Sequence, residues 1–119
     1  MTVHDIVALL GARILCCEDL LDEEVRSACG SDLMSDVLAF VKERSVLLTG
    51  LTNQHAIRTA EILDVLCVIF VRGKEPTDDI LAMAKERDIV ILVTEYTLFT
   101  ACGILYEQGL RGGRPHHGR

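Results

Sequence analysis

Three apolar runs rich in β-branched residues recur at a constant interval in the second half of the chain. The runs VLLTG, VIFVRG and VILVTE begin at residues 46, 68 and 90, so they are spaced 22 residues apart. A short polar break and a stretch with helical periodicity follow each run. Segments such as CVIFV and IVILV are apolar on both alternating faces, which is typical of strands covered by helices on both sides. The pattern predicts three parallel strands in an internal sheet.

Residues suited to helix ends lie between and after these strands. Asn53 is placed to cap a helix that runs to about Leu63. Thr77 is placed to cap the next helix, and Thr97 to open a final helix that stops at Gly109. Each predicted strand is therefore followed by its own helix, as parallel βα units require.

The first 45 residues contain two further helices and two further strands. We expect the helices at residues 3–10 and 32–42 and the strands at residues 13–17 and 25–29. Thr2 and Asp5 resemble a capping box for the first helix, and Ser31 can cap the second. Together these elements predict an α/β fold with three layers, α/β/α, and about five strands in a mostly parallel sheet built from short βα repeats.

The chain of 119 residues has the length of one compact domain. We expect this domain to cover residues 1–110. Residues 111–119, RGGRPHHGR, contain three arginines and no hydrophobic residue, so they are expected to form a disordered basic tail. Half of all residues are hydrophobic, whereas a five-stranded sheet has a limited interior. We therefore expect a homodimer that covers the remaining apolar surface.

Charge and hydropathy exclude several kinds of partner. Lys and Arg number 12 and Asp and Glu 18, which gives a net charge of −6, and Trp is absent. Such a chain lacks the basic surface and the stacking side chains that bind nucleic acid. No apolar stretch approaches the ~18 residues of a membrane span, and the amino terminus does not resemble a secretory signal. We expect a cytoplasmic protein without nucleic-acid or membrane partners.

The five cysteines include no C-x-x-C pair, and their odd number argues against a disulfide framework. Cys16 and Cys17 are neighbours in a predicted strand, so their side chains should point to opposite faces and cannot share a metal. We expect no metal and no cofactor. Cys29 differs, because it ends a strand just before Gly30 and a helix start, an arrangement that can stabilise a thiolate. It is the candidate redox residue.

Common catalytic signatures are missing. The sequence contains no P-loop, G-x-G-x-x-G, G-x-S-x-G or H-E-x-x-H motif, and we expect no catalytic residues. His4 and His55 both lie at predicted helix starts, where surface positions are usual. A small enzyme would have to use Cys29 with Ser31 and Asp32 as its nucleophile region.

The carboxyl ends of the predicted parallel strands form the candidate ligand site. Ligands of open parallel sheets bind beyond these strand ends, where loops and helix amino termini meet. Glycines there admit close approach to the backbone, and Arg72 and Lys74 supply positive charge for a phosphate or carboxylate. The expected ligand-binding residues are Gly30, Ser31, Thr49, Gly50, Thr52, Asn53, Arg72, Gly73, Lys74 and Thr94.

Five segments carry a resemblance to a known family. They are GARILCCEDLLDEEV, ACGSDLMSDVLAFV, LLTGLTN, VIFVRGKEPTDDILAMAKERDIVILVT and FTACGILYEQGL. Their order and their amino-acid sequences resemble the DRTGG domain, in particular the small stand-alone DRTGG proteins found beside iron-only hydrogenase genes. At the first name-giving motif Gly50 fits, with Leu51 and Thr52 in place of the usual Asp-Arg pair. At the second motif Gly73 and Pro76 fit, with Val71-Arg72 in place of Thr-Gly.

The resemblance implies an α/β accessory module, similar to those attached to HPr kinase, phosphate acetyltransferase and a nucleotide-regulated pyrophosphatase. Our leading hypothesis is a non-catalytic, dimeric sensor or regulatory module that binds a small anionic ligand, with nucleotides as candidates, in redox or hydrogen metabolism. A second hypothesis is an iron-sulfur or redox accessory factor for a hydrogenase that uses Cys29, with a larger redox enzyme as partner. A small enzyme is the third.

Overall fold

The computed structural model of the chain describes residues 1–40 and 44–112. The elements follow in the order α1 (Val3–Leu10), β1 (Arg13–Cys16), the 3-10 helix η1 (Glu18–Leu20), β2 (Ser27–Gly30), α2 (Met34–Phe40), β3 (Ser45–Thr49), α3 (Gln54–Ile62), β4 (Cys67–Phe70), α4 (Asp78–Glu86), β5 (Val90–Val93) and α5 (Leu98–Glu107). Part of the second predicted helix, residues 41–42, lies outside the described residues. The 22-residue spacing seen in the sequence corresponds to the successive units that begin with β3, β4 and β5.

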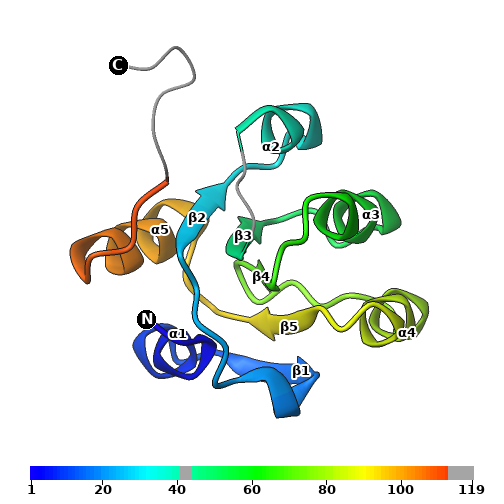
Figure 1. Cartoon of the computed structure of the whole chain (residues 1–119), viewed down its shortest axis with the longest axis horizontal. Helices are drawn as coiled ribbons and strands as arrows, with labels where there is room; N and C mark the ends of the chain where they lie inside the picture. The colour runs from blue at the N-terminus through cyan, green and yellow to red at the C-terminus, as the bar shows by residue number, and fades with distance from the viewer. Residues whose placement is uncertain (41–43, 113–119) are drawn as a thin grey trace.

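The five strands form one sheet in the order β1-β5-β4-β3-β2. Strands β2, β3, β4 and β5 run parallel, and β1 pairs antiparallel with β5 at one edge. Helices α2, α3 and α4 cover one face of the sheet, and α1 and α5 cover the other (Figure 1). The predicted fold class, a three-layer α/β fold with a mostly parallel five-stranded sheet, is confirmed.

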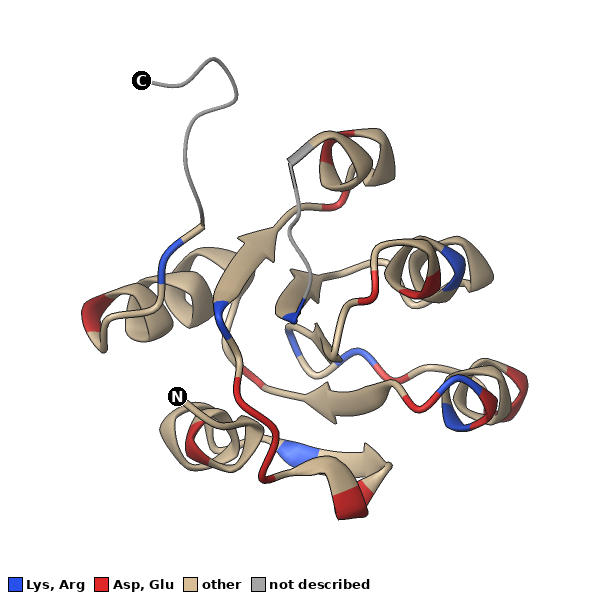
Figure 2. Cartoon of the chain, viewed as in Figure 1, with Lys and Arg blue, Asp and Glu red and all other residues tan. Residues whose placement is uncertain are grey.

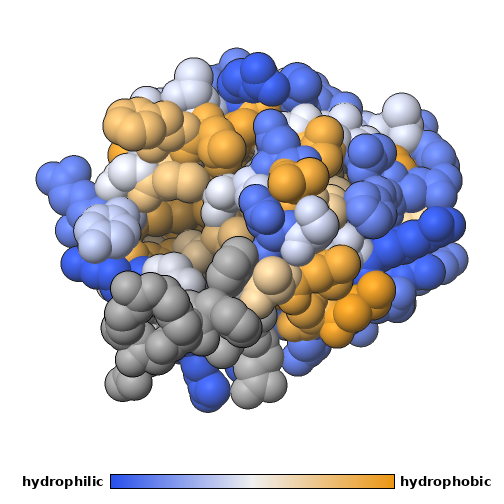
Figure 3. Space-filling model, turned by 90° about the horizontal axis from the view of Figure 1, so that it is seen from above, coloured by the Kyte–Doolittle hydropathy of each residue, from blue (hydrophilic) through white to orange (hydrophobic). Residues whose placement is uncertain are grey.

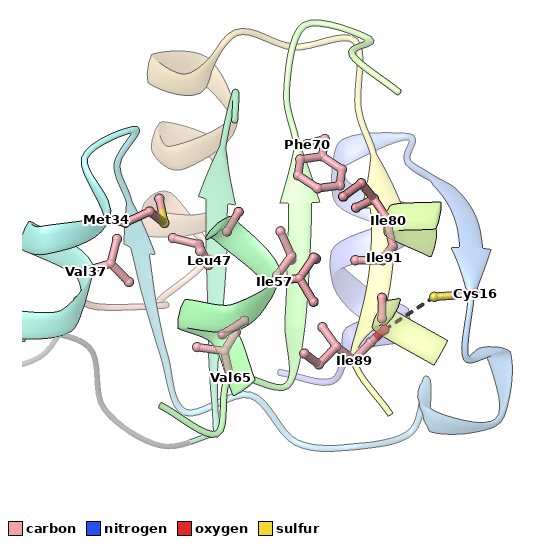
Figure 4. Packing of buried hydrophobic residues seen from close by; sticks show 14 of the residues in the cluster. Cys16, Met34, Val37, Leu47, Ile57, Val65, Phe70, Ile80, Ile89 and Ile91 are labelled. Carbon is pink, nitrogen blue, oxygen red and sulfur yellow. Dashed lines mark hydrogen bonds between the residues drawn. The ribbon is translucent and has the colours of Figure 1, made fainter. Parts of the chain in front are cut away.

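Both faces of the central strands are buried. Leu47, Val68 and Ile91 pack under α2, α3 and α4 in one cluster, whose side chains Figure 4 shows gathered between sheet and helices. Their neighbours Leu48 and Ile69 pack on the opposite face against α1 and α5. Alternating residues of one strand thus enter two separate cores, which explains why these runs are apolar at every position.

Three of the predicted helix starts have the expected hydrogen bonds. Thr2 and Asp5 form a reciprocal capping box at α1, which lowers the pKa of the Asp5 carboxyl. Asn53 accepts from the Ala56 amide at α3, and Thr97 from the Thr100 amide at α5. Thr77 is an exception to the predicted capping. It precedes α4, but its hydroxyl donates to the Asp79 carboxylate and does not accept from the helix backbone.

The end of β1 differs from the prediction. The strand stops at Cys16, and Cys17 adopts a left-handed backbone conformation with φ 63°, so the two cysteines are not consecutive residues of one strand as predicted. The Cys16 thiol donates to the Ile89 carbonyl at 3.3 Å. Partial burial, together with the neighbouring Cys16 thiol, raises the pKa of Cys17 to about 12. The irregular pairing of β1 with β5 near Cys16 lets the chain turn away here.

The chain after α5 closes against β2. The Ala28 amide donates to the Arg111 carbonyl at 3.0 Å, and the Arg111 guanidinium lies 3.8 Å from the centre of the Tyr106 ring. Residues 111 and 112 were predicted to begin a disordered tail, whereas these contacts make them part of the folded body. The rest of that prediction, residues 113–119, lies outside the described residues.

Helix α3 offers a matched pair of isoleucines for testing the core. Ile57 is fully buried, whereas Ile62 is 72% exposed. We expect Ile57→Ala to lower the free energy of unfolding by about 2 to 5 kcal/mol, because it removes buried apolar contacts and leaves a cavity. Ile62→Ala should change it by less than about 0.5 kcal/mol. Urea unfolding of both variants measures the difference, and equal losses would contradict this placement of α3.

Candidate functional site

The predicted site residues share one edge of the sheet, here called the strand-end edge. Because β2, β3, β4 and β5 are parallel neighbours, their carboxyl ends lie side by side. The register pairs Gly30 with Leu48 and Thr49 with Phe70, so the loops that follow begin at nearly the same level. This brings Gly30, Ser31, Thr49, Gly50, Thr52, Asn53, Arg72, Gly73, Lys74 and Thr94 to the same edge.

A carboxylate of the chain itself binds the donors at the end of β3. Asp32 Oδ1 accepts from the Gly50 amide at 2.7 Å and from the Thr49 hydroxyl at 3.0 Å. The Thr49 hydroxyl oxygen also accepts from the Leu51 amide at 3.1 Å. The sequence predicted that Thr49 and Gly50 would bind a ligand, whereas in this structure their donors hold Asp32. The short charge-assisted bonds show that this turn is built to hold an oxyanion.

Arg72 lies in a tight turn after β4, and its guanidinium reaches across the strand-end edge to Gly50. Arg72 and Gly73 are both left-handed, with φ 58° and 66°. Their amides donate to the Tyr96 and Thr94 carbonyls at 2.8 and 2.9 Å, which fixes the turn against the loop after β5. A left-handed backbone is unfavourable for a residue with a Cβ. The chain nevertheless places an arginine here, before Gly73, which adopts the same conformation without this cost.

Two of the three glycines at the strand-end edge, Gly50 and Gly73, make room for charged side chains. A Cβ on Gly50 would lie 2.9 Å from an Arg72 guanidinium nitrogen and 3.5 Å from Asp32 Oδ1. A Cβ on Gly73 would lie 2.8 Å from both Glu95 carboxylate oxygens. Close approach to the backbone was predicted for a ligand at both positions. The groups that approach here are the guanidinium of Arg72 and the carboxylates of Asp32 and Glu95.

Arg72 and Lys74 are exposed, and neither forms an ion pair or a side-chain hydrogen bond with another described residue. Glu75, which could have paired with them, instead lies 3.2 Å from Arg13. Two cations thus remain available to solvent beside the carboxylates of Asp32 and Glu95. The strand-end edge therefore has mixed charge, with a guanidinium and an ammonium that an anion could reach.

Other predicted site residues use their polar groups within the fold. Thr94 is 1% exposed, and its hydroxyl donates to the Leu10 carbonyl at the end of α1 at 2.9 Å. The Asn53 side chain caps α3, and the Ser31 hydroxyl accepts from the Leu33 amide at 3.0 Å. Thr94 thus joins the strand-end edge to α1.

The environment of Cys29 disfavours a thiolate. Burial raises the pKa of the Cys29 thiol, and the neighbouring Cys102 and Asp36 raise it further. The expected stabilisation by a helix amino terminus is wrong, because α2 begins only at Met34 and places the acidic Asp36 in its first turn. Within residues 1–40 and 44–112 no cluster of three or more His, Cys, Asp or Glu side chains could hold a metal ion.

An apolar hollow that sequence reasoning missed lies on the outer face of α5. It measures about 860 Å³ and is lined by Leu98, Phe99, Cys102, Gly103, Tyr106 and Glu107. Hydrophobic side chains gather around a hollow on the face drawn in Figure 3. The sequence did carry a signal, since residues 98–106, LFTACGILY, contain no charged residue although they form a surface helix.

No described helix is long and apolar enough to cross a lipid bilayer.

Comparison with known proteins gives a family match and a structural similarity. The DRTGG domain matches residues 5–107. The structure is similar to the crystal structure of the CBS and DRTGG domains of the regulatory region of Clostridium perfringens pyrophosphatase, complexed with activator, diadenosine tetraphosphate. The identity is 18% and the TM-score 0.70, and the match covers 87% of this chain but 45% of that one. No match was found among curated proteins. At this identity the structural similarity establishes a shared fold.

The role of Asp32 can be tested by removing its carboxylate. Asp32→Ala should lower the free energy of unfolding by about 1 to 3 kcal/mol, because the Gly50 amide and the Thr49 hydroxyl lose a charged acceptor. Asp22→Ala, at an exposed position, is the control and should change it by less than about 0.5 kcal/mol. Chemical denaturation distinguishes the two, and an unchanged Asp32→Ala chain would contradict the structural role of this carboxylate.

The protonation of Cys29 gives a pH-dependent prediction. Because its pKa is raised above the usual 9.0, the thiol is neutral at pH 7, and iodoacetamide should modify it more slowly than free cysteine. The rate should increase with pH and reach its midpoint above 9.0. Peptide-resolved mass spectrometry follows Cys29 separately from the other thiols. Rapid modification at pH 7 would revive the redox hypothesis.

Proposed function

The chain belongs to the DRTGG domain family, and on this premise we propose that it is a non-catalytic regulatory module that binds a small anionic ligand at the strand-end edge. The observation that carries this proposal is the placement of Arg72. It has an unfavourable left-handed backbone, its guanidinium crosses Gly50, and it lacks an ion-pair partner among the described residues. Arg44, Asp64 and Asp88 share the left-handed backbone, so the guanidinium over Gly50 and its charge, unpaired within the described part of the chain, distinguish Arg72.

The charges around Arg72 favour a nucleotide over a simple anion. Arg72 and Lys74 can bind phosphate oxygens through charge-assisted hydrogen bonds. Asp32 and Glu95 lie beside them and would repel a ligand that is anionic throughout, but their carboxylates can accept from ribose hydroxyl groups. A ligand with phosphate at one end and hydroxyl donors at the other fits this mixture. The pyrophosphatase regulatory region, solved with diadenosine tetraphosphate, provides one such compound as a probe.

A non-catalytic role agrees with the state of the candidate nucleophiles. The Cys29 thiol is disfavoured as a thiolate, Ser31 bonds the backbone of Leu33, and Asp32 is held by Thr49 and Gly50. His4 and His55 are exposed in the first turns of α1 and α3. None of these described residues forms a nucleophile and base pair. The iron-sulfur or redox hypothesis based on Cys29 therefore gains no support.

The resemblance to stand-alone proteins found beside hydrogenase genes extends this proposal. We place the module in redox or hydrogen metabolism, where it would report ligand binding to a larger redox enzyme. Binding at the strand-end edge could reach a partner through α1, because Thr94 links this edge to the end of that helix.

The proposal is tested by replacing both free cations. At 100 times its dissociation constant a ligand adds about 2.7 kcal/mol of stability. Thermal unfolding with AMP, ATP, diadenosine tetraphosphate and pyrophosphate should reveal such stabilisation in the natural chain. The double variant Arg72→Ala with Lys74→Ala should lose it, because charge-assisted bonds contribute about 1.5 to 3 kcal/mol each. Without ligand its stability should stay within about 0.5 kcal/mol of the natural chain, because both side chains are exposed.

A matched control replaces two other exposed cations, Arg58 on α3 and Lys85 on α4, with Ala. This control has the same net charge as the test variant and should keep the ligand-induced stabilisation. Stabilisation that survives in the Arg72→Ala, Lys74→Ala chain would place the anion elsewhere and contradict the proposed site. Failure of all four compounds to stabilise the natural chain would contradict a nucleotide ligand.

A further inference from the structure

We propose that the outer face of α5 is the interface between two copies of this chain, which pack with their α5 helices antiparallel about a two-fold axis. The term α5 face denotes Phe99, Cys102, Gly103 and Tyr106. This inference goes beyond ligand binding, because the α5 face is distinct from the strand-end edge cations and would associate with or without a ligand. The second copy is identified by the shape and the charge of the face.

The α5 face exposes an unusual amount of apolar surface for one helix. Phe99 is 89% exposed and Tyr106 59% exposed, and both line the hollow of about 860 Å³. Gly103 also lines it, and a Cβ added there would meet nothing within 4 Å. Two aromatic side chains thus flank an open depression over bare helix backbone. Such a surface provides both a knob and a hole for packing between helices.

The spacing of these residues makes the α5 face complementary to itself. Phe99, Cys102, Gly103 and Tyr106 are arranged symmetrically about the midpoint between positions 102 and 103. If a second α5 lies antiparallel across this midpoint, Phe99 of each copy faces Tyr106 of the other, and each Gly103 faces Cys102. In a two-fold interface, each contact between unlike residues occurs twice in this way. The small pair at the centre would let the helices approach closely, and the aromatic pairs would close both ends.

Charge favours a second copy as the occupant of this face. The chain has a net charge of −6, so two copies repel each other over most of their surfaces. Residues 98–106 carry no charge, and Figure 2 shows α5 free of charged residues until its carboxyl end. Antiparallel helices also align their dipoles favourably.

The two ends of the α5 face complement each other in charge. Arg111 is exposed and stacks on Tyr106 at the carboxyl end, and the exposed Glu95 precedes the amino end. In the antiparallel arrangement Arg111 of one copy approaches Glu95 of the other, and the two-fold axis repeats this attraction. The seven residues after Gly112, GRPHHGR, contain no large hydrophobic side chain and would not match the apolar hollow.

Light scattering of the natural chain at micromolar concentrations, without ligand, tests the proposal and should give the mass of a dimer. Phe99→Asp should raise the dissociation constant at least about tenfold, because it replaces an aromatic anchor with a charge inside the contact, opposite the partner's Tyr106. Ile62→Asp is the matched control, because Ile62 is similarly exposed on α3, which covers the other face of the sheet. It should remain dimeric. A monomeric natural chain, an unchanged dissociation constant in Phe99→Asp, or equal weakening in both variants would each overturn the proposal.

Cross-linking tests the antiparallel register in the same dimer. In a Cys102→Ser background, Phe99→Cys combined with Tyr106→Cys should form disulfides between copies under mild oxidation. Phe99→Cys alone should not, because residues 99 and 106 are separated by about 10 Å along the helix, so the two copies of position 99 remain apart. Cross-linking of the single variant, or none in a double variant that scattering shows to be dimeric, would overturn this register.

Discussion

The burial of three strands on both faces is the constraint on which the rest of the structure depends. Strands such as β4 have no polar face to turn toward water, so helices must cover both sides of the sheet. Each crossover between parallel strands then returns the chain to the same edge of the sheet before the next strand begins. The polar loop residues consequently end together at the opposite edge. The apolar core thus determines where Arg72, Lys74 and Asp32 meet, although none of these residues belongs to it.

The local sequence predicted most of the features that depend on local contacts, although the cap expected at Thr77 does not form. The apolar runs located β3, β4 and β5, and the capping side chains of Thr2, Asn53 and Thr97 were found because each cap bonds an amide three residues away. Features that depend on distant contacts were not predicted. The chain leaves β1 at Cys17, where the pairing of β1 with β5 is irregular. The Arg111 carbonyl accepts from the amide of Ala28 in β2, the edge strand farthest from β1. No nearby residue signals either contact.

The candidate site shows the same division between local and distant information. The positions of its residues followed from the parallel strands, but the partners of their polar groups did not. Gly50 and Gly73 were predicted to admit close approach of a ligand, whereas in the structure the groups that approach them include Arg72 and Glu95. Thr94 lies at the strand end as expected, although its hydroxyl belongs to the end of α1, 84 residues earlier in the chain. Sequence alone predicted which residues share the strand-end edge, and side-chain geometry decided which of their polar groups remain free there.

The hydrogen bond between the Ala28 amide and the Arg111 carbonyl has a consequence for aggregation. Strand β2 is the outermost strand of the parallel part of the sheet, and an open edge of this kind can pair with strands of other molecules. The Arg111 carbonyl occupies one of its outward amides, and Gly112 lies against the carbonyl of the same residue. At the other edge β1 is short and irregular, which also discourages further pairing. Residues 111 and 112 therefore block part of this open edge and should hinder the pairing of β2 with strands of other molecules, an effect separate from recognition of any ligand.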